Sequence, residues 1–141
     1  MQKFIGQGPG NLVPNTEYMS FKANGAIAKG DVVGFLVGTN ATGYTVDQAN
    51  ASTITPIGVA AEVAADGEWF NVIVSGYCNY VTNDGTDIVA GDFLVAGAGV
   101  AVPYTAAELG AAPTQYANVF GQALDAETTT TLTEAIIFKR I

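Results

Sequence analysis

Three pairs of carboxylates are the side chains of this sequence whose spacing could support acid–base chemistry. Glycoside hydrolases cleave a glycosidic bond with two such groups. Each pair here lies in turn-like sequence, which favours solvated loop acids over a catalytic pair. The pairs are Asp66 with Glu68, Asp84 with Asp87, and Asp125 with Glu127.

Other residue types that carry catalysis are scarce. Histidine, the commonest general base and a common metal ligand, is absent. None of the three serines, Ser20, Ser52 and Ser75, lies in a Gly-x-Ser-x-Gly context. The single cysteine, Cys78, has neither a histidine to activate it nor a partner for an internal disulfide. We therefore predict that the protein is not an enzyme, with no catalytic residues and no cofactor.

Two binding functions deserve the same test. The segment "NDGTD" (83–87) offers oxygen ligands for calcium, but it lacks the spacing and the bidentate glutamate of an EF-hand. We therefore predict no metal site. Trp69, Tyr77 and Tyr80 could form a platform that stacks on a sugar, although a tryptophan in an apolar strand is also typical of a core or a subunit interface. A carbohydrate-binding module on a virion or cell surface therefore stays open as an alternative.

The distribution of charge argues against nucleic acid and membranes as partners. The formal net charge is −8, and no Lys or Arg occurs between Asp31 and Phe138. Binding to phosphate groups or to an anionic membrane surface needs clustered basic residues. The first ten residues, "MQKFIGQGPG", lack the apolar core of a signal peptide, so we expect synthesis in the cytoplasm without export. The basic residues are Lys3, Lys22, Lys29, Lys139 and Arg140.

Residues 1–24 are predicted to form an extended N-terminal arm, and residues 25–141 a folded body that does not need it. The stretch "GQGPGNLVPN" contains three Gly and two Pro, which interrupt helices and sheets. A solvated tail would not need the apolar residues that accompany them. We expect these residues to contact a neighbouring subunit or a capsid: Phe4, Ile5, Leu12, Val13 and Tyr18.

The body reads as an all-β domain with one short helix. Runs of Val, Ile, Phe and Tyr are separated by Gly, Asn, Asp and Thr. The run 68–77 alternates, which places Phe70, Val72 and Val74 on one face of a strand. The exception is "TAAELG" (105–110), which has the spacing of a capping box and predicts a helix.

Two halves of the body, about 25–80 and 86–141, form a weak internal repeat. In each half an apolar strand follows a Gly-Asp turn, at Gly30-Asp31 and at Gly91-Asp92. Glycine can take the positive φ of such a turn, and aspartate can bond to the turn's backbone. Two similar units favour a small Greek-key-like β-barrel or sandwich. The other matches are Tyr44-Thr45 with Tyr104-Thr105, Ile57–Ala60 with Phe120–Ala123, and Val72–Val74 with Ala135–Ile137.

The segment "PIGVAAEVAADGEWFNVIVSGYCNYV" (56–81) resembles the capsid decoration, or cement, proteins of tailed bacteriophages, and "GAIAKGDVV" (25–33) is similar to the part that often precedes it. The resemblance implies a small β-rich, non-enzymatic domain on the outside of the head, where it stabilises the capsid lattice. It also implies the major capsid protein as partner, an N-terminal arm that pairs with it, and a homotrimer. A tail or neck component of a virion is a further alternative.

Overall fold

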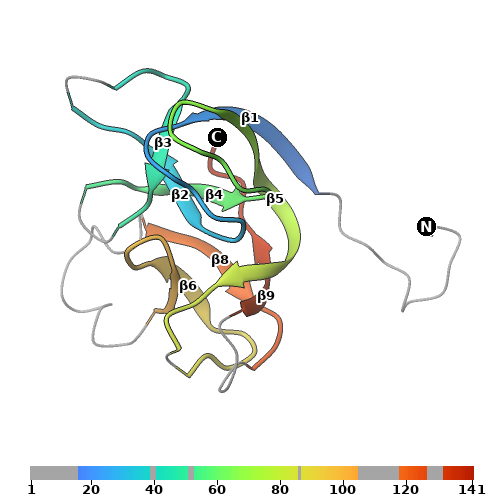
Figure 1. The fold of residues 1–141 in the computed structure, drawn as a ribbon. Coiled ribbons are helices and arrows are strands. Elements are labelled where there is room, and N and C mark those ends of the chain that lie inside the picture. The colour runs from blue at the N-terminus through green and yellow to red at the C-terminus, as the bar shows by residue number, and fades with distance from the viewer. Residues whose placement is uncertain (1–15, 39–40, 51–52, 86, 105–117, 127–131) are drawn as a thin grey trace, which may run out of the picture.

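The computed structural model describes residues 16–38, 41–50, 53–85, 87–104, 118–126 and 132–141. These residues form nine strands and no α-helix, which confirms the predicted all-β fold (Figure 1). The predicted helix at 105–110 lies outside the described residues. No helix in the described part has the length and apolar character needed to cross a membrane. The strands are β1 (Glu17–Ala23), β2 (Val32–Phe35), β3 (Thr45–Gln48), β4 (Pro56–Ala60), β5 (Trp69–Thr82), β6 (Phe93–Ala96), β7 (Ala101–Pro103), β8 (Val119–Ala123) and β9 (Leu132–Ile137).

The first five strands close into a barrel, which we call the N-terminal unit; it comprises β1 to β4 and residues 69–75 of β5. The strand order is β1-β3-β2-β4-β5, and pairing between β1 and β5 closes the ring. The β1–β3 pair is parallel and the others are antiparallel, so the barrel is mixed. Closure leaves this unit no open sheet edge.

Strand β5 is long and strongly curved, and it passes from one half of the molecule into the other (Figure 1). Its residues 76–82 begin the second half, which we call the C-terminal unit, together with β6 to β9. The order here is β5-β9-β8-β6-β7. A parallel bridge from Asn83 to Ala101 brings β7 back to the chain that leaves β5. The second half of β5 therefore takes the place that β1 has in the N-terminal unit.

Strand registers confirm the repeat at most of the predicted positions. Strand β4 matches β8, and residues 72–74 of β5 match residues 135–137 of β9, as the sequence indicated. The equivalent pairs are Val33↔Gly58 with Leu94↔Gly121, Ala60↔Val72 with Ala123↔Ala135, and Tyr18↔Ile73 with Tyr77↔Ile136.

One of the predicted matches is wrong. Tyr44-Thr45 does not correspond to Tyr104-Thr105, because the counterpart of β3 is β7 and β7 ends before Tyr104. The connection between β6 and β7 is a short turn over residues 97–100, whereas β2 and β3 are joined by residues 36–44. Because the turn at 97–100 is shorter than the connection at 36–44, β7 comes earlier in the second half than the predicted match at Tyr104-Thr105 requires.

Buried side chains of the described residues form two hydrophobic clusters. The first fills the barrel of the N-terminal unit and includes Phe70, Val72 and Val74, the face predicted from the alternation in β5. The second fills the C-terminal unit, with Phe120 and Leu94 among its fully buried side chains. Burying a side chain of this size stabilises the fold by about 1.5–3 kcal/mol.

The second cluster also contains Val32, Val59 and Ile73, which belong to strands of the N-terminal unit. Their neighbours along each strand point into the first barrel, so these three side chains point outward from it. They are nevertheless 0%, 0% and 1% exposed. The outer face of one unit is therefore covered by the other unit.

Residues 17–23, assigned to the arm by the sequence analysis, instead form strand β1. Phe21 and Ala23 lie in the first cluster, and Phe21 meets Phe35 edge-on with 5.6 Å between ring centroids. The apolar alternation at the end of this segment therefore serves the barrel itself. The boundary between arm and body moves from residue 24 to the start of β1.

Candidate interaction surfaces

Three of the carboxylates that sequence spacing singled out, Asp66, Glu68 and Asp125, accept hydrogen bonds from backbone N–H groups. Asp66 accepts a hydrogen bond from the backbone N–H of Gly25 at 2.8 Å, and Glu68 accepts one from Ala65 at 2.7 Å. Asp125 accepts one from Ala126, and its predicted partner Glu127 lies outside the described residues. Within the part of the chain that the structure describes, no three acidic or cysteine side chains gather as metal ligands.

The two Gly-Asp turns have the same geometry. Gly30 and Gly91 have φ values of 93° and 94°, in the left-handed region that favours glycine. One carboxylate oxygen of Asp31 accepts from the N–H of Ala28 at 2.9 Å, and Asp92 accepts from Val89 at 2.9 Å. Gly30, Asp31, Gly91 and Asp92 thus set the backbone turns that lead into β2 and β6, and they have the same structural role in both units.

Of the apolar residues proposed as contacts, Tyr18 is the one that the structure describes. It lies on β1, opposite Ile73 of β5, and its side chain is 56% exposed. The other four, Phe4, Ile5, Leu12 and Val13, lie outside the described residues. Tyr18 therefore marks the surface beside the point where residues 1–15 join the barrel.

Trp69, Tyr77 and Tyr80 do not form the shared platform that a sugar site would need. Trp69 stacks on Tyr44 at 5.3 Å, whereas the hydroxyl of Tyr77 donates to Glu134 and raises the pKa of Tyr77 to about 12. Tyr80 lies under the ammonium group of Lys29, 4.4 Å from the ring centroid. Each ring has a separate partner, so this arrangement does not favour carbohydrate binding.

Cys78 is 1% exposed within the second cluster. Burial raises the pKa of its thiol to about 11, so the thiolate form is disfavoured at neutral pH. The residue has the properties of a packed core side chain.

Several large apolar side chains of the described residues are exposed, and most of them were not singled out by the sequence analysis. Val37, which follows β2, Tyr44, which precedes β3, and Trp69, which begins β5, are 55%, 47% and 58% exposed. Phe93 of the C-terminal unit is 47% exposed and lies 6.3 Å from Phe138, measured between ring centroids. The alternation of residues along a strand does not predict that these side chains are exposed. Their exposure depends on which face of one unit is covered by the other unit.

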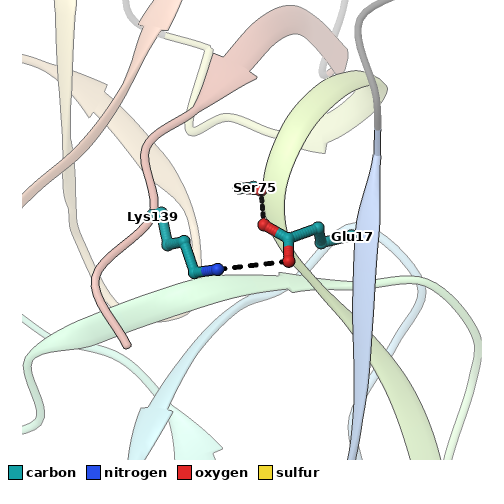
Figure 2. Close-up of polar contacts among 3 residues, drawn as sticks. All are labelled: Glu17, Ser75 and Lys139. Carbon is teal, nitrogen blue, oxygen red and sulfur yellow. Dashed lines mark hydrogen bonds and ion pairs between the residues drawn. The ribbon is translucent and has the colours of Figure 1, made fainter.

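A polar contact joins the start of β1 to the C-terminal segment (Figure 2). Glu17 accepts a hydrogen bond from the hydroxyl of Ser75 at 2.7 Å and pairs with the ammonium group of Lys139 at 3.2 Å. Both interactions favour the carboxylate, so they lower the pKa of Glu17, and the Ser75 bond has the larger effect. The base of the N-terminal segment and the C-terminal segment therefore share one corner of the molecule.

We expect Ser75→Ala to raise the pKa of Glu17 toward its ordinary value more than Lys139→Ala does. Because the folded pKa is lowered, the contact stabilises the fold above the unfolded pKa of Glu17 and is lost as pH falls through the folded pKa. The measurement is an NMR titration of the Glu17 side-chain carboxyl in the three proteins. An unchanged pKa in Ser75→Ala would show that the hydroxyl does not hold the carboxylate.

A search of solved structures found a similar fold in the N-terminal base of the head fibre protein gp8.5 of bacteriophage phi29. The TM-score is 0.59 with 21% sequence identity, and the match covers 88% of this chain and 95% of the other. Neither the protein-family models nor the curated proteins gave a match. At this identity the likeness establishes a shared fold, which spans both units of this chain.

Proposed function

We propose that this chain is a non-enzymatic structural protein of a bacteriophage virion that attaches to the outside of the head. The observation that carries the proposal is the fold shared with a head fibre base over nearly the whole of both chains. The acidic body, without Lys or Arg between Asp31 and Phe138, supports a protein rather than a nucleic acid as partner. The major capsid protein is the partner that fits this role.

We propose that the N-terminal residues form the segment that binds the capsid. The apolar residues Phe4, Ile5, Leu12 and Val13 alternate with glycines and prolines, and each contributes about 1.5–3 kcal/mol if fully buried on a partner. Addition of an extended strand to an exposed sheet edge suits such a sequence. Tyr18, exposed at the start of β1, would extend the contact onto the barrel.

We expect deletion of residues 2–14 to lower occupancy on purified, undecorated heads without changing the melting curve of the free protein. The deletion ends before β1, so it leaves the barrel strands intact. The measurement is binding to heads by cosedimentation, with cryo-electron microscopy of the decorated particles. Unchanged occupancy would move the capsid contact to the barrel surface.

Two roles on the head are compatible with attachment, and a stability assay separates them. If the chain is a cement protein, we expect it to raise the temperature at which filled heads release DNA; if it is the base of a fibre, we expect that temperature to stay unchanged. The fold match favours the base of a fibre as the second candidate, because the similar protein bears that description. Electron microscopy of the native particle distinguishes the head from the tail or neck.

Self-association, with a homotrimer as the expected form, completes the proposal. Exposed and half-buried aromatic rings lie together at Tyr44 with Trp69 and at Phe93 with Phe138, and contiguous exposed apolar surface is typical of sites that other protein covers. Many weak contacts on a symmetric lattice would then act together through avidity.

A further inference from the structure

We propose that Asn24-Gly25 is a site of spontaneous chemical modification, and that the carboxylates of Asp47 and Asp66 suppress its reaction while the N-terminal barrel is closed. The inference goes beyond attachment to a phage head and does not depend on it. It rests on hydrogen bonds that join the bend at 24–25, which directly follows β1, to strand β3 and to the turn at 66–67.

The chemistry is deamidation, to which asparagine is most prone when glycine follows it, because glycine leaves the backbone nitrogen accessible. Asn24-Gly25 is the one such pair in the sequence. The nitrogen of Gly25 attacks the side-chain carbonyl carbon of Asn24, and the bond from this carbon to the amide nitrogen breaks. Ammonia leaves with the proton that the Gly25 nitrogen gives up. Water then opens the resulting succinimide ring at either carbonyl, which yields aspartate or isoaspartate.

The fold occupies both reacting groups. The N–H of Gly25, which supplies the nucleophile, donates to a carboxylate oxygen of Asp66 at 2.8 Å. A hydrogen bond to a carboxylate holds that proton in place, whereas the attack requires the nitrogen to lose it. The side-chain amide of Asn24 donates to Asp47 at 2.7 Å, which ties it to β3. The backbone N–H of Asn24 donates to the carbonyl of Val46 at 2.8 Å, so the main chain is held as well.

The turn at 66–67 is a second labile dipeptide, and the same contacts occupy it. Aspartate followed by glycine forms the same kind of ring, with loss of water in place of ammonia. The carboxylate of Asp66, which would be attacked, accepts from Gly25. The N–H of Gly67, which would attack it, donates to the carbonyl of Ala23 at 2.9 Å. Each of the two segments therefore holds reactive groups of the other, and both are protected while they stay in contact.

Conversion of Asn24 would weaken closure of the barrel. The new carboxylate would face Asp47 where an amide donor lies 2.7 Å away, and like charges at such a distance repel. Isoaspartate also adds a methylene group to the main chain directly after β1, where Asn24 bonds to Val46 of β3. The modification therefore acts against the β1–β3 pairing that helps to complete the ring of strands.

The test follows Asn24 in the free full-length protein, folded and in urea, at mildly alkaline pH. Trypsin cleaves after Lys22 and Lys29, so the peptide 23–29 reports on Asn24 alone, by its mass and by separation of its aspartate and isoaspartate forms. We expect this peptide to stay unconverted in the folded wild type over times in which the urea-unfolded chain converts. Conversion of the folded protein at the rate of the unfolded chain would overturn the inference.

Asp66→Ala and Asp47→Ala are each expected to accelerate conversion of Asn24 in the folded protein about tenfold or more, because each removes one charge-assisted hydrogen bond from the site. Asp125→Ala is the matched control and should leave the rate unchanged. Its carboxylate likewise accepts from a backbone N–H, that of Ala126, but it lies after β8.

Gly121→Ala separates local protection from overall stability. It places a methyl group against the carbonyl of Ile136, and so weakens the C-terminal unit without touching the contacts of Asn24. We expect it to convert at the wild-type rate, with folding of every variant checked by circular dichroism. Asp47→Ala supplies an independent reading if Asp66→Ala does not fold. An unchanged rate in a folded carboxylate variant, or an equal acceleration in Gly121→Ala, would show that these carboxylates do not protect the site.

Discussion

Removal of residues 2–22 is expected to abolish the cooperative thermal transition of the free protein, whereas removal of residues 2–14 leaves it in place. The longer deletion removes nearly all of β1, which pairs with both β3 and β5 and closes the N-terminal barrel. Phe21, 3% exposed, leaves with it. Loss of a buried phenylalanine alone costs about 3–5 kcal/mol, and a domain of this size has about 5–15 kcal/mol in total.

Circular dichroism melts of the two deletion proteins provide the measurement. The point variant Phe21→Ala tests the same strand in the full-length chain and should lose about 3–5 kcal/mol in urea unfolding. A cooperative melt that survives removal of residues 2–22 would show that β1 is dispensable, and that the barrel can close without it.

Gly58→Ala is expected to be among the most destabilising single substitutions in the chain. A methyl group there would lie 2.1 Å from the carbonyl oxygen of Ile73, on the neighbouring strand β5. Backbone atoms of a central strand cannot yield without loss of the β4–β5 pairing, so the cost should reach or exceed the upper end of about 1–3 kcal/mol. The equivalent Gly121 faces the carbonyl of Ile136 at 2.6 Å, and Gly121→Ala should have a similar but smaller effect.

Gly43→Ala is the control for this pair. An added methyl group at Gly43 meets nothing within 4 Å, and its φ lies outside the left-handed region. We expect its unfolding free energy to stay within about 0.5 kcal/mol of the wild type. Urea unfolding of the three variants measures the order Gly58, Gly121, Gly43. Equal stability of Gly58→Ala and Gly43→Ala would contradict the close approach of β4 and β5.

Local patterns predicted the strands and the repeat, because both depend on side-chain alternation and turn residues. The alternation of Phe70, Val72 and Val74 identified the inner face of β5, and the Gly-Asp dipeptides located the starts of β2 and β6. Strand β1 was not recognised. It pairs with residues about fifty positions away, and glycines and prolines precede it, so no hairpin signal marks it.

The candidate surfaces could not be predicted from local patterns for a different reason. Val32 and Phe93 occupy the same position in equivalent strands, yet one is buried and the other is half exposed. The difference arises from the packing of one unit over the other, which is a tertiary property. Tyr44 and Trp69 likewise meet through tertiary pairing, because Lys22 of β1 is opposite Thr45 on one side and opposite Trp69 on the other.

The covered row Val32, Val59 and Ile73 has a consequence for synthesis on the ribosome. The N-terminal barrel has all its strands once Ser75 has emerged, but the strands that cover its outer row end at Ile137. At typical rates of 5–20 residues per second, translation of the intervening roughly 60 residues takes about 3–12 s. During these seconds the nascent chain presents a finished barrel with an uncovered apolar row. Other nascent chains on the same polysome present the same apolar row. Aggregation between these chains therefore competes with folding during this interval, which the order of synthesis sets.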